Sequence, residues 1–94
     1  MLEPLDPLLH SQLRLAIMSI LISHESADFV YIKNTTGATA GNISIQLDKL
    51  EKVGYIKITK SFLNKRPHTN CKITAKGMTA FEKYVTMIKN YLHQ

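Results

Sequence analysis

Apolar residues recur at helical spacing in four segments of the chain and alternate with polar residues in two others. The first helix is expected near residues 8–24, where apolar residues continue almost all round the helix. Such a helix must be covered on two sides. One side is expected to face the chain's own core. The opposite side, with Leu15, Met18 and Ile22, is expected to meet a second copy of the chain.

Two further helices follow, separated by a tight turn. The segment "ESADFVYIKNTTG" predicts a short helix that is capped by Ser26 or Asp28 and ended by Gly37 in the left-handed conformation. Thr39 then caps a third helix over 39–53. Two helices joined by a glycine-containing turn are typical of a helix-turn-helix, although many helical pairs share this pattern.

A β-hairpin is expected after the third helix. In "YIKITKSF" the apolar residues Ile56, Ile58 and Phe62 lie on one side of a half-buried strand, and in "HTNCKIT" the inward residues are Cys71 and Ile73. Between these strands "LNKRP", residues 63–67, predicts a polar, basic loop.

The last segment predicts a helix over 75–92, capped by Thr74 and apolar at i, i+3, i+4 and i+7. No repeat or linker interrupts the 94 residues, so a single domain over 1–94 is expected. The fold class is α+β, mostly α. Its order of three helices, a two-stranded β-hairpin wing and a C-terminal helix is that of a winged helix-turn-helix.

The stretches "TAGNISIQLDKLEKVGYI" and "KRPHTNCKITAKG" carry a family resemblance. Together they resemble the small stand-alone winged-helix transcriptional regulators related to the MarR and ArsR groups, over roughly residues 8–92. The chain departs from that pattern at Ile45 and Gln46, where relatives often have a basic residue followed by His, and at Cys71, where an aromatic is common.

The resemblance implies a homodimer that reads double-stranded DNA and is more often a repressor than an activator. It also implies that the helices near 8–24 and 75–92 build the dimer, in agreement with the two-sided first helix. The recognition helix, 39–53, would enter the major groove. The wing, 63–67, would contact the backbone or the minor groove.

Charge supports a polyanionic partner. Up to residue 30 the chain has one base and four acids, whereas from residue 31 it has eleven bases and three acids. A basic half on a small protein suggests nucleic acid or an anionic membrane. The longest apolar run, Leu13–Ser23, is about half of what a membrane-spanning helix needs. The start lacks the features of a signal peptide, and one cysteine is compatible with a reducing cytosol, so a cytoplasmic protein without a membrane partner is expected.

The outward face of the third helix supplies most candidate contacts. Thr39, Ser44 and the free amides of the first turn can bind phosphate. Asn42 and Gln46 can each pair with an adenine edge, and Ile45 can touch a thymine methyl. Each residue also has a purely structural interpretation: Thr39 as a cap, Asn42 as a solvated side chain, Ile45 as an ordinary surface residue.

Gly41 is a poor helix former in the first turn and costs about 1 kcal/mol relative to Ala. Its absent side chain would let the helix approach DNA closely. The alternatives are that it avoids a clash with the second helix or is a tolerated defect. In the wing, Asn64, Lys65 and Arg66 form a basic tip that Pro67 stiffens, although such a tip can also be a soluble turn. The candidate DNA-binding residues are therefore Thr39, Gly41, Asn42, Ser44, Ile45, Gln46, Lys49, Asn64, Lys65 and Arg66.

No pattern points to catalysis, a metal or a cofactor: the four histidines are scattered, and Cys71 has no second cysteine beside it. We therefore expect a protein that is not an enzyme, with Cys71 as a small apolar strand residue. The alternative function is a winged-helix module that binds protein without DNA, which exposed Ile45 would favour. A small-molecule effector has little room except at the dimer seam, near Met18, Tyr84, Met87 and Tyr91.

Overall fold

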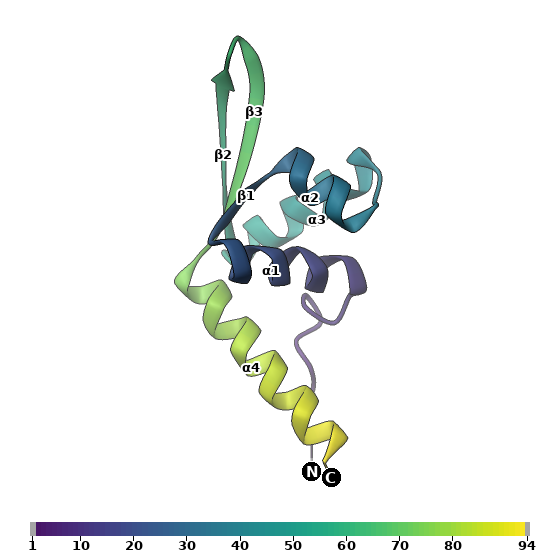
Figure 1. Cartoon of the computed structure of the whole chain (residues 1–94). Coiled ribbons are helices and arrows are strands. Elements are labelled where there is room, and N and C mark those ends of the chain that lie inside the picture. Colours follow the sequence, from purple (N-terminus) through teal and green to yellow (C-terminus); the bar gives the residue numbers. More distant parts are fainter. Residues whose placement is uncertain (1, 94) are drawn as a thin grey trace.

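Residues 2–93, which the computed structural model describes, form four helices and one three-stranded antiparallel sheet (Figure 1). The elements in chain order are α1 (Gln12–His24), β1 (Ser26–Asp28), α2 (Phe29–Thr36), α3 (Ala40–Lys52), β2 (Ile56–Leu63), β3 (Arg66–Ile73) and α4 (Ala75–Leu92). The expected winged helix-turn-helix is confirmed.

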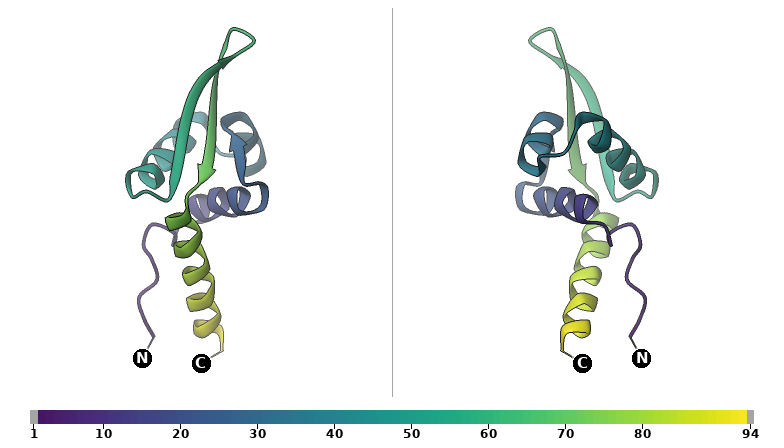
Figure 2. Two further views of the ribbon diagram at one scale, coloured as in Figure 1. Left: turned by 90° about the vertical axis from the view of Figure 1, so that its left-hand side faces the viewer. Right: turned by 90° about the vertical axis from the view of Figure 1, so that its right-hand side faces the viewer.

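The elements are arranged in layers along an elongated molecule of 54 × 25 × 21 Å. Helix α1 crosses the middle. The α2–α3 pair and the hairpin lie on one side of it, and α4 and the N-terminal segment lie on the other (Figures 1 and 2). The core gathers where these layers meet, with Ile17, Leu21, Ile32, Ile43 and Leu50 fully buried. In the described part of the chain, no helix is long and apolar enough to cross a membrane.

Helix α1 begins later than predicted, at Gln12 instead of near Leu8. Asp6 causes the difference, because its carboxylate accepts from the amide of Leu8 at 2.9 Å and its carbonyl accepts from the amide of His10 at 2.9 Å. These bonds hold residues 7–10 in turns. Ser11 then caps the helix by accepting from the amide of Arg14.

The two sides of α1 are covered within the same chain to a greater extent than predicted. Met18, expected on the outward side, is fully buried in the core, and Leu15 is half-buried against it. Only Ile22 of that expected group is exposed, at 37%. The reason is that α1 contacts α2, α3 and β3 on one side and α4 on the other.

A third strand, β1, occupies the place where only a helix cap was expected. It pairs with β3 through Ala27 and Cys71, so the sheet order is β1-β3-β2 instead of a lone hairpin. Asp28 is the cap of α2, accepting from the amide of Tyr31 at 2.7 Å, and Gly37 ends that helix with a φ of 73°.

Helices α3 and α4 follow the prediction closely. Thr39 caps α3, whose buried face is Ile43, Leu47 and Leu50. Thr74 caps α4 by accepting from the amide of Gly77 at 3.0 Å. Gly77 packs so tightly that an added Cβ would lie 2.1 Å from the carbonyl oxygen of Tyr55.

Candidate nucleic-acid interface

The first two turns of α3 present a small, polar surface to solvent. Asn42 and Ser44 are exposed, and the Ile45 side chain is 55% exposed. The hydroxyl of Thr39 accepts from the amide of Asn42 at 3.2 Å, so the predicted cap is present. The predicted orientation of this helix is therefore confirmed, while contact of these residues with DNA stays a prediction.

Gly41 lies in the middle of this surface, and no atom comes within 4 Å of where its Cβ would be. An alanine at this position would therefore clash with no other part of the chain. The alternative that Gly41 avoids a clash with α2 is therefore wrong, because nothing of α2 is near. The space beside Gly41 is open to solvent, so close approach to DNA and a tolerated defect both stay as interpretations of this glycine.

Gln46 differs from its neighbours on α3 because it is half-buried and bonded on both sides. Its Oε1 accepts from the guanidinium of Arg14 at 2.6 Å, and its Nε2 donates to Oδ1 of Asn42 at 2.8 Å. A paired adenine contact needs one acceptor and one donor from the same amide. Here the oxygen of each amide, Oε1 of Gln46 and Oδ1 of Asn42, already accepts one hydrogen bond within the chain.

Arg14 is a residue that the candidate list missed. It is the lone base among the first 30 residues and lies between Leu13 and Leu15 in an apolar run. A charge in such a run needs a partner once the helix is half-buried. That isolation is the signal that could have marked Arg14, but the pattern does not name a partner 32 residues away.

The tip of the wing is a two-residue turn, shorter than the predicted loop over 63–67. Asn64 and Lys65 have φ values of 53° and 64°, as in a type I′ turn, and Leu63 already pairs with Arg66. Asn64, Lys65 and Arg66 are all exposed, as expected. Pro67 belongs to β3 instead of the loop.

Two apolar side chains next to this turn are also exposed: Phe62 at 77% and Leu63 at 58%. Phe62 was expected on the buried side of the strand with Ile56 and Ile58. It does lie on that side by alternation, but the hairpin extends beyond the body, since β1 covers β3 only from Asn70 to Lys72. The expectation that Phe62 is buried is therefore wrong, and the tip is both basic and apolar.

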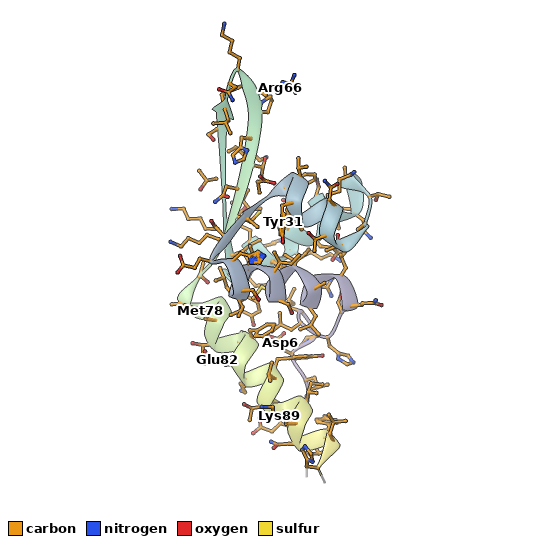
Figure 3. The ribbon with its side chains drawn as sticks, viewed as in Figure 1. Asp6, Tyr31, Arg66, Met78, Glu82 and Lys89 are labelled. Atoms are coloured by element: carbon orange, nitrogen blue, oxygen red, sulfur yellow. The ribbon has the colours of Figure 1, made fainter. Side chains whose placement is uncertain are left out.

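The α2–α3 pair and the hairpin lie on the same side of α1, away from the end of α4 (Figures 1 and 2). Arg66 and Lys89 lie near opposite ends of the molecule (Figure 3). Lys49, on α3, and Lys57 and Lys60, on β2, are exposed. The hydrogen bond from the amide of Ile58 to the carboxylate of Glu51, at 2.9 Å, joins α3 to the hairpin. This bond fixes the end of α3 against the base of the hairpin.

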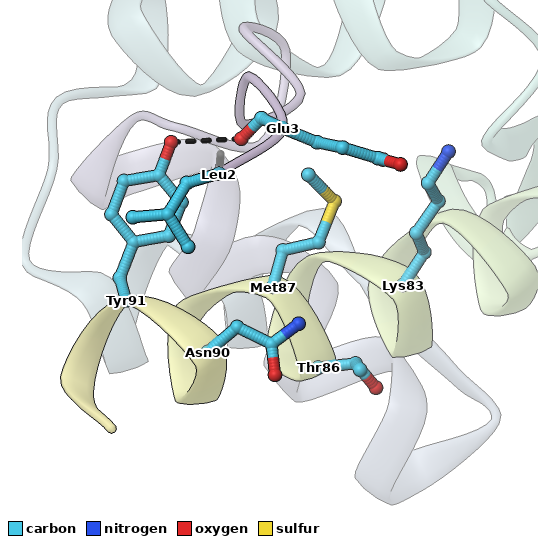
Figure 4. A pocket seen from close by; sticks show the side chains of 7 residues that line it. All are labelled: Leu2, Glu3, Lys83, Thr86, Met87, Asn90 and Tyr91. Atoms are coloured by element: carbon cyan, nitrogen blue, oxygen red, sulfur yellow. Dashed lines mark hydrogen bonds between the residues drawn. The ribbon is translucent and has the colours of Figure 1, made fainter. Parts of the chain in front are cut away.

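The other end of the molecule joins the N-terminal segment to α4. Tyr91 donates to the carbonyl of Glu3 at 2.8 Å beside a pocket that Leu2, Met87 and Asn90 also line (Figure 4). Tyr84 lines a neighbouring pocket. Three of the four residues expected near an effector, Tyr84, Met87 and Tyr91, line these two pockets. The fourth, Met18, is buried in the core and lines neither pocket.

Two groups with shifted pKa values lie outside the candidate surface. Burial raises the pKa of the Cys71 thiol to about 11, so this side chain is a protonated, weakly nucleophilic group at neutral pH. Burial and a 2.5 Å hydrogen bond to the Asp6 carboxylate raise the pKa of Tyr55 to about 12. Within residues 2–93, no three His, Cys, Asp or Glu side chains gather as a metal site would require.

Comparison with known proteins gives a consistent result. Residues 13–92 match the sequence model of a family described as winged helix DNA-binding domain. Over 76 residues the chain is 37% identical to "Uncharacterized protein MJ0432" of Methanocaldococcus jannaschii, covering 81% of this chain and 83% of that protein. The resemblance to winged-helix transcriptional regulators is thereby confirmed at the level of the family.

Two solved structures show the same fold. The transcriptional regulator homologue protein from Pyrococcus horikoshii OT3 superposes with a TM-score of 0.85 at 29% identity, over 92% of this chain and 85% of that chain. A mutant MarR from E. coli complexed with operator DNA superposes with a TM-score of 0.76 at 20% identity, over 94% of this chain and 62% of that chain. The second likeness is one of fold alone.

Proposed function

We propose that this chain, which belongs to the family of winged helix DNA-binding domains, is a cytoplasmic transcriptional repressor that binds specific sites in double-stranded DNA as a homodimer. The observation that carries the proposal is the open first turn of α3, where Gly41 has free space on its outer side, on the same side of α1 as the basic wing. The solved structure of a mutant MarR with operator DNA supports the choice of partner.

The dimensions favour α3 as the reading element. A major groove is about 12 Å wide and a helix with its side chains is about 10 to 12 Å across, so a helix that enters must be closely placed. The missing side chain at Gly41 permits that approach. Thr39, Ser44 and the amides at the start of α3 would then bind phosphate, Ile45 would touch a thymine methyl, and Lys49 would add a peripheral phosphate contact.

The wing would make the second contact. Asn64, Lys65 and Arg66 would reach the backbone or the minor groove beside the helix. Exposed Phe62 and Leu63 would pack against sugars at the same place, because an apolar tip between basic side chains suits a groove whose walls are anionic.

Dimer formation is proposed through the helices near 8–24 and 75–92. Helix α4 extends away from the body with Met78 42% and Leu92 73% exposed, and Ile22 of α1 is also exposed (Figure 1). A two-fold axis there would place two α3 helices in successive major grooves, about 34 to 36 Å apart, on a near-palindromic site. Selection of bound sites from random DNA, together with sedimentation velocity, tests symmetry and mass at once.

The wing is tested by removing its charge without disturbing its turn. Lys65 has a positive φ, so Lys65→Gly keeps the turn, and Arg66→Gln keeps the length of the side chain. The double variant should bind all duplexes more weakly. The slope of log K against log salt should fall in magnitude by about 1.8, because two fewer counterions are released.

The matched control is Lys83→Gln with Lys89→Gln, which removes two exposed charges from α4, far from the wing (Figure 3). Because α4 is also proposed to form the dimer, the titrations are made at concentrations where sedimentation velocity shows the same mass for the variant and the wild type. There this variant should keep the wild-type salt slope in fluorescence anisotropy or gel-shift titrations. Equal slopes for the wing variant and the wild type would mean that the wing does not contact DNA.

A second candidate is a winged-helix module that binds protein without DNA, favoured by exposed Ile45, Phe62 and Leu63. A gel shift with mixed genomic fragments at low and moderate salt separates the two. No retained complex even at low salt would favour the protein-binding function.

A further inference from the structure

Three side chains from two helices form a continuous hydrogen-bonded chain under the candidate reading surface. Arg14 of α1 donates to Oε1 of Gln46 at 2.6 Å, and Nε2 of Gln46 donates to Oδ1 of Asn42 at 2.8 Å. Gln46 and Asn42 are one helical turn apart on α3, and Asn42 is the exposed member. The charge of Arg14 is thereby connected to the first turn of α3.

The orientation of both amides follows from the chemistry of Arg14. A guanidinium carries only donors, so Gln46 must turn its oxygen toward Arg14. The nitrogen of Gln46 then faces Asn42 and must donate, so Asn42 must present its own oxygen to Gln46. Each amide thus has one of the two lone pairs of its oxygen engaged inside the chain, which fixes the orientation of both amides. The Nδ2 group of exposed Asn42 is turned away from Gln46 as an outward donor.

Arg14 is anchored and cannot follow Gln46 into a groove. Its Nε donates to the carbonyl of Leu8 at 2.6 Å, and a terminal nitrogen donates to the carbonyl of Pro7 at 3.5 Å. Both carbonyls belong to the turn that Asp6 holds at the start of α1. The acceptor of Gln46 is therefore tied to the body of the domain.

We propose that Arg14 is a positioning residue that makes the start of α3 a donor surface, so that the base it reads is guanine in preference to adenine. Adenine presents an acceptor and a donor in the major groove, whereas guanine presents two acceptors, N7 and O6. A donor surface matches guanine, whereas the adenine amino group would have to share an oxygen that already accepts a hydrogen bond within the chain. This proposal rests on the proposed function and replaces the adenine contacts expected for Asn42 and Gln46.

The test is selection of bound sites from random duplex DNA with the full chain. The wild type should enrich guanine at one position of each half-site, and replacing that guanine by 7-deazaguanine should weaken binding about tenfold. Arg14→Met keeps the apolar stem and removes the donors. It should shift the preference at that position toward adenine by about tenfold, with an unchanged salt slope because Arg14 contacts no phosphate in this arrangement.

Two further variants separate positioning from folding. Arg14→Lys keeps a charge and a donor, and should retain guanine. Gln46→Leu frees the oxygen of Asn42 without touching the anchor of Arg14, and should shift toward adenine as Arg14→Met does. Side-chain amide resonances of Gln46 and Asn42, observed by NMR without DNA, should move in Arg14→Met and stay close to their wild-type positions in Arg14→Lys.

The outcomes are distinguishable. A wild type that enriches adenine at this position, or an Arg14→Met variant that keeps guanine, would overturn the positioning role and leave DNA binding intact. Amide resonances that do not respond to Arg14→Met would overturn it as well. A wild type that enriches no site at low salt would overturn the proposed function, and the guanine preference with it.

Discussion

The first turns of α3 and α4 are built alike, with a threonine cap and a glycine, but their surroundings differ completely. Around Gly41 of α3, nothing lies within 4 Å of an added Cβ. At Gly77 of α4, an added Cβ would lie 2.1 Å from the carbonyl oxygen of Tyr55 and 3.0 Å from the side chain of Ile73. The chain's own packing therefore explains the second glycine and leaves the first unexplained.

The difference teaches which helix start serves the fold and which is open to a partner. Glycine in a helix weakens it by about 1 kcal/mol relative to alanine. Gly77 lets α4 pack directly against the carbonyl of Tyr55 and the side chain of Ile73, and this packing offsets the loss. At Gly41 no contact inside the chain offsets it, and we infer that an external surface does.

The largest expected effect is that of Gly77→Ala. The new methyl group overlaps a backbone carbonyl, so α4 or the segment at Tyr55 must shift. We expect a loss of about 3 kcal/mol or more in the free energy of unfolding, measured by urea denaturation followed by circular dichroism. A loss below about 1 kcal/mol would show that the junction yields easily and that the two glycines are less different than their surroundings suggest.

The caps are expected to differ less. The hydroxyl of Thr74 accepts from the amide of Gly77 and also donates to the carbonyl of Gly54 at 2.6 Å, whereas the hydroxyl of Thr39 accepts from the amide of Asn42. Thr74→Ala should lower the free energy of unfolding by about 2 kcal/mol and Thr39→Ala by about 1 kcal/mol. In gel shifts the order should reverse, with Thr39→Ala weakening DNA binding more. Equal effects in both assays would contradict the division of roles.

Gly41→Ala should raise stability while lowering function. The free energy of unfolding should increase by about 0.5 to 1 kcal/mol, because alanine is the better helix former and the space is open. Affinity for a selected duplex should fall, since the methyl group occupies the space through which α3 approaches DNA. Unchanged affinity would mean that DNA does not approach the chain at Gly41, and the absent side chain would then not be evidence for DNA binding.

The smallest expected effect is on the pH dependence of stability, and it concerns Tyr55, whose carbonyl lies against Gly77 of α4. Tyr55 has its pKa raised to about 12, whereas an unfolded tyrosine titrates near 10. Below pH 10 both states keep the proton. Between pH 10 and 12 the unfolded chain loses it first, so stability falls as pH rises. Tyr55→Phe should show a shallower decline in that window. Identical pH profiles would mean that the hydrogen bond to Asp6 adds nothing.

Local signals predicted α3 and α4 well. Thr39 and Thr74 are side-chain caps at the start of clear helical periodicity, and both helices begin directly after them. The same periodicity also predicted that Ile43, Leu47 and Leu50 form the buried face of α3. These features depend on residues within a few positions of one another, which is why one sequence suffices to find them.

Features that depend on distant partners were missed. Strand β1 has three residues, too few for a pattern, and exists because Ala27 meets Cys71 on β3. The bond between Arg14 and Gln46 spans 32 residues. The wing loop was predicted too long because Asn64 and Lys65 alone adopt left-handed backbone angles, so Leu63 and Arg66 stay paired. Arg14 fixes the orientation of the Gln46 amide, which no local pattern could have predicted.

The continuous pairing of the hairpin, from Ile56 opposite Ile73 to Leu63 opposite Arg66, has a thermodynamic consequence. A wing made as a long open loop would lose backbone entropy when it settled on a partner, at about 1 to 2 kcal/mol for each residue that became ordered. Here that ordering is complete when the domain folds. We infer that the basic tip would meet a DNA target already shaped, so that none of its electrostatic attraction would be lost to ordering the wing.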